Sequence, residues 1–95
     1  MSDEKPTSEH VQYGDGFATI TLSRPVDLDG TKVSTIQMRE PNMDDQIIIE
    51  KMKGGDAERA RGIFANLCDL PPSVIGKLPV RDIQRLGAAF AGFTD

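Results

Sequence analysis

The chain has 95 residues, of which 38% are hydrophobic and 27% charged, a composition typical of one soluble globular domain with a small core. Its net charge of −4 disfavours nucleic acid as a partner, because phosphate binding requires clustered lysine and arginine. No apolar run approaches the roughly 20 residues of a membrane span, and the polar start predicts no signal peptide, so we expect a cytoplasmic protein with no membrane contact.

The start of the chain is polar and shows no periodicity. Residues 1–15 are therefore predicted to form a disordered tail, and residues 16–95 a single domain. Within the tail, Gly14-Asp15-Gly16 resembles the start of a dinucleotide-binding loop. The third glycine is missing and a strand follows rather than a helix, so we interpret this segment as a turn.

A β-hairpin is predicted next. Apolar and polar residues alternate from Phe17, which is typical of a half-buried strand, and Pro25 requires that strand to lie at an edge or to contain a bulge. Asp29-Gly30 predicts a tight turn, because both residue types tolerate positive φ. The return strand is predicted over residues 31–39.

The return strand breaks its own alternation. Val33 lies an odd number of residues from Ile36, so strict alternation would turn these two side chains to opposite faces. A bulge near Ser34 or Thr35 would restore the register, and we predict one there.

Helical signals dominate the remainder of the chain. Asn42 suits an N-cap, and Gly54-Gly55 suits a C-terminal break, so residues 43–53 are predicted to be helical despite three consecutive isoleucines. Further helical segments are predicted over residues 57–69, over residues 73–77, and from Pro79 through an apolar stripe of Ile83, Leu86, Phe90 and Phe93. The predicted fold is α+β, an N-terminal antiparallel β-hairpin packed against three to four short helices.

The first predicted helix is apolar on two sides. At 100° per residue, Ile48, Ile49 and Met52 share one side, whereas Met43 and Ile47 lie on roughly the other. One side can pack against the domain. The second either meets a partner protein or another subunit, or is wrapped by the core, and the sequence leaves both open.

Residues that could carry chemistry are scarce. His10 is the only histidine, and no Cys/His cluster predicts a metal site. Cys68 follows an apolar helical stripe, so we interpret it as a core residue rather than a nucleophile. The acid pair Asp44-Asp45 is expected to be solvated in the first turn of a helix. We predict neither catalytic nor cofactor-binding residues, and therefore no enzyme.

The order of the segments is more specific than any of these features. The hairpin ITLSRPVDLDGTKVSTIQMREP is followed by two helices and then by LCDLPPSVIGKLPVRDIQRL. This order resembles the small tail assembly chaperones of Mu-like and related tailed phages and prophages. The residues that carry the resemblance are Pro25, Asp29-Gly30, Met38-Arg39-Glu40-Pro41, Leu70-Pro71-Pro72 and Asp82. The resemblance covers about residues 17–93.

The resemblance implies a non-enzymatic role in the bacterial host cytoplasm. Such chaperones are thought to bind the tape measure protein, which is long and aggregation-prone, and to be absent from the mature virion. Many tailed phages also make a longer form of the chaperone by translational frameshifting. On this view Met43 and Ile47 belong to the partner-binding surface, because both side chains adapt to varied apolar helices.

Other functions remain open on the sequence alone. The chain could be a structural component of the tail, or a small prophage-encoded protein-interaction module. A regulator that binds nucleic acid is disfavoured by the net charge. A homo-oligomer is also possible, because a core this small often needs a partner.

Overall fold

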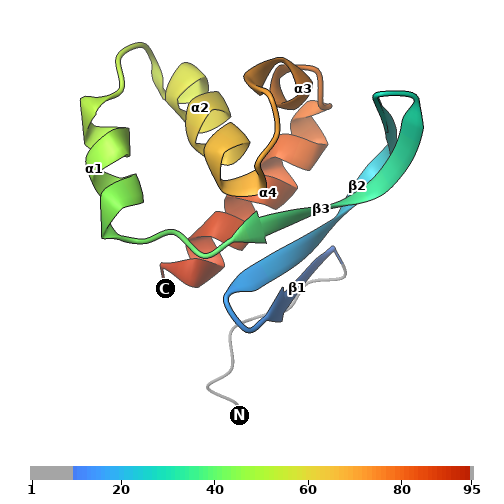
Figure 1. Cartoon of the computed structure of the whole chain (residues 1–95), viewed down its shortest axis with the longest axis horizontal. Coiled ribbons are helices and arrows are strands. Elements are labelled where there is room, and N and C mark those ends of the chain that lie inside the picture. The colour runs from blue at the N-terminus through green and yellow to red at the C-terminus, as the bar shows by residue number, and fades with distance from the viewer. Residues whose placement is uncertain (1–9, 95) are drawn as a thin grey trace.

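A computed structural model describes residues 10–94 as a three-stranded sheet followed by four helices (Figure 1). The elements are β1 (Val11–Gly14), β2 (Phe17–Leu28), β3 (Thr31–Arg39), α1 (Met43–Lys51), α2 (Asp56–Cys68), α3 (Pro72–Gly76) and α4 (Val80–Phe93). The sheet is antiparallel with strand order β1-β2-β3. The predicted α+β class, with the strands at the N-terminus, is confirmed.

The first strand, β1, lies where a disordered tail was predicted. Val11 is buried and pairs with Ile20 of β2. Tyr13 packs edge-on against Phe93 with ring centroids 5.1 Å apart, and its hydroxyl donates to the carbonyl oxygen of Ala89 at 3.0 Å. The tail prediction is therefore wrong for residues 11–14, because this segment gains a strand partner and a helix to pack on. Residues 1–9, the rest of the predicted tail, lie outside the described residues.

The turn between β2 and β3 follows the prediction. Asp29 and Gly30 have φ values of 53° and 85°, which is the pair of positive angles that a type I′ hairpin turn requires. The amide of Gly30 also donates to Asp27 Oδ1 at 2.9 Å. These contacts fix the register at the end of the hairpin, where Leu28 pairs with Thr31.

The predicted bulge exists, but on the opposite strand. Thr21 pairs with Thr35 and Val26 pairs with Val33, so residues 22–25 of β2 lie opposite Ser34 alone. The predicted one-residue bulge near Ser34 or Thr35 is therefore right in its position along the hairpin, but wrong in its strand and its size. Pro25 explains the side, because proline has no N–H to donate to the strand ladder and the irregularity forms around it.

The helices differ from their predicted bounds by only a few residues. The largest change is in α1, which ends at Lys51 rather than at residue 53, because Met52 already has an extended backbone with ψ of 141°. Asp69 ends α2 in the left-handed conformation, with φ of 56°. Pro79 stands just before α4, where its fixed φ suits the start of a helix.

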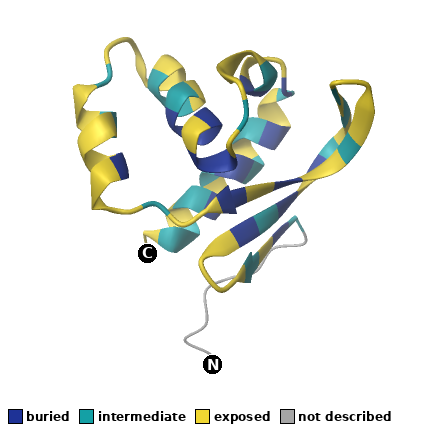
Figure 2. Ribbon diagram, in the orientation of Figure 1, coloured by how far each residue is buried: buried dark blue, intermediate teal, exposed yellow. Residues whose placement is uncertain are grey.

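The core lies between one face of the sheet and helices α2 to α4 (Figure 2). Ala18, Ile20 and Leu22 are the buried face of β2, whereas the alternate residues Thr19 and Thr21 are more exposed. The core residues contributed by the helices and the loop before α4 are Ile63, Phe64, Ala65, Leu67, Cys68, Ile75, Leu78, Leu86 and Ala89. Helix α1 stands at the side of this core and is coloured as mostly exposed in Figure 2.

Candidate protein-binding surfaces

Helix α1 is anchored at its N-terminus by a polar clasp. The Asn42 side chain accepts a hydrogen bond from the amide of Asp45 at 3.1 Å, and Asp45 Oδ2 accepts from the amide of Asn42 at 2.8 Å. This reciprocal arrangement is a capping box, which satisfies backbone donors that a helix end leaves without intrahelical partners. The predicted N-cap is confirmed.

An arginine from β3 completes this clasp. Arg39 Nη1 and Nη2 donate to the two carboxylate oxygens of Asp45 at 2.7 and 2.8 Å, and Asn66 of α2 adds a longer contact at 3.4 Å. Asp45 is only 2% exposed, so the expectation that it is solvated is wrong. The hydrogen bonds from Arg39 hold the pKa of Asp45 below its usual range, and the same pairing raises the pKa of Arg39.

The C-terminal half of α1 is held by apolar contacts. Ile49 and Met52 are half-buried and pack against the core. The Met52 side chain lies over Gly62 of α2, in the space that a larger residue would fill. The helix is therefore fixed at both ends while only Asp45 within it is buried.

The remaining apolar residues of α1 face solvent. Met43 is 72% exposed, and Ile47 and Ile48 are each 42% exposed. The placement of Ile48 with the inward-facing Ile49 is therefore wrong, as is the alternative that the core wraps this helix on all sides. We call Met43, Ile47 and Ile48 the α1 surface. The structure brings Met43 and Ile47 together one helical turn apart, as the spacing predicts.

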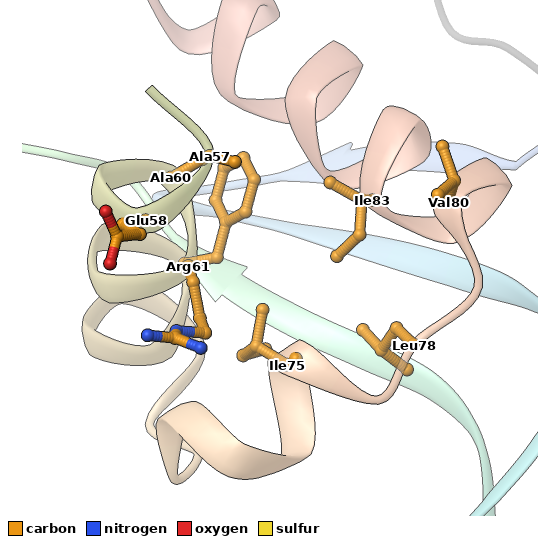
Figure 3. A pocket seen from close by; sticks show the side chains of 10 residues that line it. Ala57, Glu58, Ala60, Arg61, Ile75, Leu78, Val80 and Ile83 are labelled. Carbon is orange, nitrogen blue, oxygen red and sulfur yellow. The ribbon is translucent and has the colours of Figure 1, made fainter. Parts of the chain in front are cut away.

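A second apolar surface lies between α2 and α4, and we call it the α2–α4 groove (Figure 3). It is an open cavity of about 410 Å³. Its lining residues are Ala57, Glu58, Ala60, Arg61, Phe64, Ile75, Gly76, Leu78, Val80 and Ile83. Val80 at its edge is 72% exposed, as much as Met43. Sequence reasoning missed this groove, because it forms only when the start of α4 comes to lie across from α2.

A second buried carboxylate fastens α4 to the irregular part of β2. Asp82 is fully buried and accepts hydrogen bonds from the Ser23 amide at 2.8 Å and from the Ser23 hydroxyl at 2.9 Å. Arg85 Nη1 donates to the carbonyl oxygen of Thr21 at 2.9 Å. Asp82 thus supplies an acceptor for Ser23, in the part of β2 that loses its strand pairing, and Arg85 binds Thr21, the last paired residue before it.

Several residues that carry the family resemblance thus stabilise the fold. Arg39 holds α1, and Asp82 holds the strand irregularity beside Pro25. Asp29 and Gly30 form the hairpin turn. The residues that carry the family resemblance therefore stabilise the fold, and they do not include the exposed residues of the α1 surface.

The groups considered for chemistry are not assembled into a reactive site. Cys68 is buried, and burial raises the pKa of its thiol to about 12, which opposes a nucleophilic role and fits the predicted core residue. Residues 10–94 bring together no group of three side chains able to hold a metal ion. In the same part of the chain, no helix has the length and apolar character needed to cross a bilayer.

Comparison with known proteins gives one result. Residues 19–95 match the family model described as "Phage tail assembly chaperone proteins, E, or 41 or 14". Searches of the curated proteins and of the solved structures return no significant match. The matched segment runs from β2 to the end of the chain, so it contains both candidate surfaces.

Proposed function

Because the chain belongs to the phage tail assembly chaperone family, we propose that it is a non-enzymatic chaperone that binds the tape measure protein and keeps it soluble. The observation that carries this proposal is the α1 surface. Met43 and Ile47 are exposed on a helix that is held at both ends. Because the helix is already ordered in the free chain, binding does not have to meet the entropy cost of ordering it.

The chemistry of the α1 surface suits a helical client with varied apolar residues. Exposed apolar side chains commonly mark protein contacts, and methionine adapts its shape because its side chain is unbranched and flexible. Met43 and Ile47 are four residues apart, which is the spacing at which one helix packs its side chains against another. A surface of this kind can cover apolar stretches of a long helical protein until the tail tube encloses it.

Co-expression with the client tests this proposal. The chain would be tagged and produced together with the long helical tail protein encoded in its native locus. We expect the long protein to be soluble and to co-purify with the wild-type chain, and to become insoluble when the chain carries Ile47→Asp. A wild-type chain that neither binds the long protein nor keeps it soluble would contradict the proposal.

A matched variant controls for the added charge. Gln46→Asp introduces the same carboxylate at the neighbouring exposed position of α1 without removing an apolar side chain. We expect it to retain the client. If Gln46→Asp and Ile47→Asp lose the client equally, the effect is electrostatic and the apolar contact is not the basis of binding.

The proposed place of action is the cytoplasm of the bacterial host, where tails assemble, and the chaperone leaves before the virion is complete. Mass spectrometry of purified virions tests this step. We expect the chain in infected-cell lysate and not in virions. Its presence in virions, at a fixed ratio to tail proteins, would instead support a structural component of the tail.

We further expect a longer, frameshifted form that shares this domain, and self-association of the chain into a homo-oligomer. Antibodies raised against the chain would detect the longer form in infected cells as a second, larger band. Sedimentation of the purified chain over a range of concentrations would measure self-association. A single band would contradict the longer form, and a monomer at all concentrations would contradict self-association. Neither result would contradict the proposed binding of the client.

A further inference from the structure

The α2–α4 groove is lined by two small side chains near the start of α2. Ala57 and Ala60 face it from α2, and Val80 and Ile83 face it from α4 (Figure 3). Ile75 lies along the side closed by α3 and the loop that follows. The alanines leave the two helices apart at this end, and the buried ring of Phe64, one turn further along α2, forms the inner end of the groove.

We infer that this groove docks one acidic, amphipathic helix of the client, with large apolar side chains in the groove and a carboxylate beside Arg61. The inference rests on the proposed chaperone function and adds to it a second surface with its own specificity. Its volume of about 410 Å³ falls in the range of sites that hold several apolar groups. Helix-in-groove binding uses anchors at positions i, i+3 or i+4, and i+7.

The charges at the groove decide the sign of the partner. Glu58 keeps its negative charge, but its Oε1 accepts a hydrogen bond from the Gly55 amide at 3.0 Å, and Figure 3 shows its carboxylate turned away from Ile83 and Val80. Arg61 makes no ion pair within residues 10–94, and its stem passes over Gly76 along the edge of the groove. Glu58 and Arg61 together leave the groove without net charge, so a carboxylate on the occupant is favoured only where it lies beside Arg61.

The groove is distinct from the α1 surface. Helix α1 lies on one side of α2, whereas α3, which closes the groove, lies on the other (Figure 1). A single client helix in the groove would therefore leave Met43 and Ile47 free for another segment. Two sites on one small chain raise the avidity for a long client that offers many helices.

Two synthetic peptides test the inference on the full chain. Both are amphipathic helices with leucines at i, i+4 and i+7, and they differ only in flanking residues, glutamate in one and lysine in the other. We expect the glutamate peptide to bind more tightly by about two- to fivefold, as one ion pair at a protein edge allows. The net charge of −4 alone would produce the opposite preference, so long-range attraction cannot explain this result.

Three variants assign the binding to the groove. Val80→Asp should weaken both peptides about tenfold or more, because it removes the exposed apolar edge. This position is the first of α4, where an aspartate suits the helix dipole, so the fold is retained. Arg61→Glu should reverse the preference between the peptides. Gln46→Asp, which adds the same charge on exposed α1 surface away from the groove, should change neither affinity.

The outcomes separate this inference from the proposed function. No binding of either peptide, or binding unchanged by Val80→Asp and Arg61→Glu, overturns the groove. A dimer of the chain alone that Val80→Asp abolishes also overturns it, because a second copy would then be the occupant. If Val80→Asp solubilises the co-expressed tail protein as well as wild type does and Ile47→Asp does not, the groove inference fails while the chaperone proposal stands. If the peptides bind as expected but wild type fails to solubilise the tail protein, the groove stands and the proposed function fails.

Discussion

Helices α1 and α4 each contain one buried carboxylate, yet they are held to the domain in different ways. Helix α4 lies across the sheet and buries Leu86 and Ala89 together with Asp82. Helix α1 buries only Asp45, and its apolar residues Met43 and Ile47 are exposed. Apolar burial holds α4 along its length, whereas α1 is held by a polar clasp at its start and by the half-buried Ile49 and Met52 at its end.

This difference shows how a small domain can present an apolar helix without unfolding. In α4, Leu86 and Ala89 build the core and are not free for a partner, and only Val80 and Ile83 at its start line the α2–α4 groove. In α1 the attachment is made by Arg39 and Asp45 at one end and by Met52 at the other, which leaves the outward side free. Such a helix is also expected to open locally at a lower free energy than the core.

The largest expected effect comes from removing core volume under α4. Leu86→Ala should lower the free energy of unfolding by about 2–5 kcal/mol, because Leu86 is fully buried and its loss leaves a cavity. Urea denaturation followed by circular dichroism measures the change. Small domains have little stability to lose, so the variant is expected to be partly unfolded without denaturant.

An exposed apolar residue on the same helix provides the control. Val80→Ala shortens a side chain that is 72% exposed, so the unfolding midpoint should move little. If both variants lowered the free energy of unfolding equally, burial of Leu86 would not be what holds α4 to the domain. The contrast between α4 and α1 would then be wrong.

A smaller effect is expected from the carboxylate of α4. Asp82→Ala leaves the Ser23 amide without its acceptor in the irregular part of β2, and charge-assisted hydrogen bonds of this kind contribute about 2–3 kcal/mol. Urea denaturation should show that loss, and hydrogen exchange should show faster exchange of the Ser23 amide. Ser23→Ala removes only the hydroxyl bond and should cost about 1 kcal/mol. If it costs as much as Asp82→Ala, the backbone contact is not the important one.

The boundaries of most elements could be predicted because their signals are local. Asn42, Asp29-Gly30 and Gly54-Gly55 act through the backbone of their immediate neighbours, and those segments were placed within two residues. The signal for β1 was also local but short. Val11 and Tyr13 alternate with a polar residue before the turn at Asp15-Gly16, a hairpin pattern hidden by the polar segment that precedes it.

What could not be predicted depends on packing between distant segments. Asp45 and Asp82 look like ordinary first-turn acids, and only their partners on β3 and β2 explain their burial. Pro25 is a local signal for the strand that holds the bulge, but the acceptor for the Ser23 amide, Asp82, comes from the distant helix α4. Of the candidate site, the Met43 and Ile47 pair followed from helical spacing, whereas the groove needed the tertiary fold.

The clasp of α1 should have an intermediate and localised effect. Asp45→Asn keeps the shape of the side chain but weakens its bonds to Arg39 and to the Asn42 amide, at a cost of about 1–2 kcal/mol. Hydrogen exchange should then accelerate in the amides of α1 and not in those of α4. Uniform acceleration through both helices would show that α1 and the core unfold as one unit.

The same carboxylate predicts a pH dependence. Because Arg39 lowers the pKa of Asp45 in the folded state, below the value of about 3.9 usual for an unfolded chain, its ionised form favours folding. This contribution is fully present above about pH 4 and is lost as the pH falls through the lowered pKa. Exchange of the α1 amides in wild type should therefore lose its extra protection in acid, and Asp45→Asn should remove that step. An unchanged acid profile in the variant would assign the step to another carboxyl.

The smallest expected change in stability comes from Ile47 on α1, and it gives the clearest test of the difference between α1 and α4. Ile47→Asp should change the free energy of unfolding by no more than about 0.5 kcal/mol, because its side chain faces solvent on the outward side of α1. Urea denaturation should then show a large loss of stability for Leu86→Ala and almost none for Ile47→Asp. Client binding, measured by co-expression, should be lost in Ile47→Asp. A loss near that of Leu86→Ala would place Ile47 in the core and leave α1 without a free apolar side. A stable variant that no longer keeps the tail protein soluble would show that α1 is held by its clasp so that its apolar side can be used for binding.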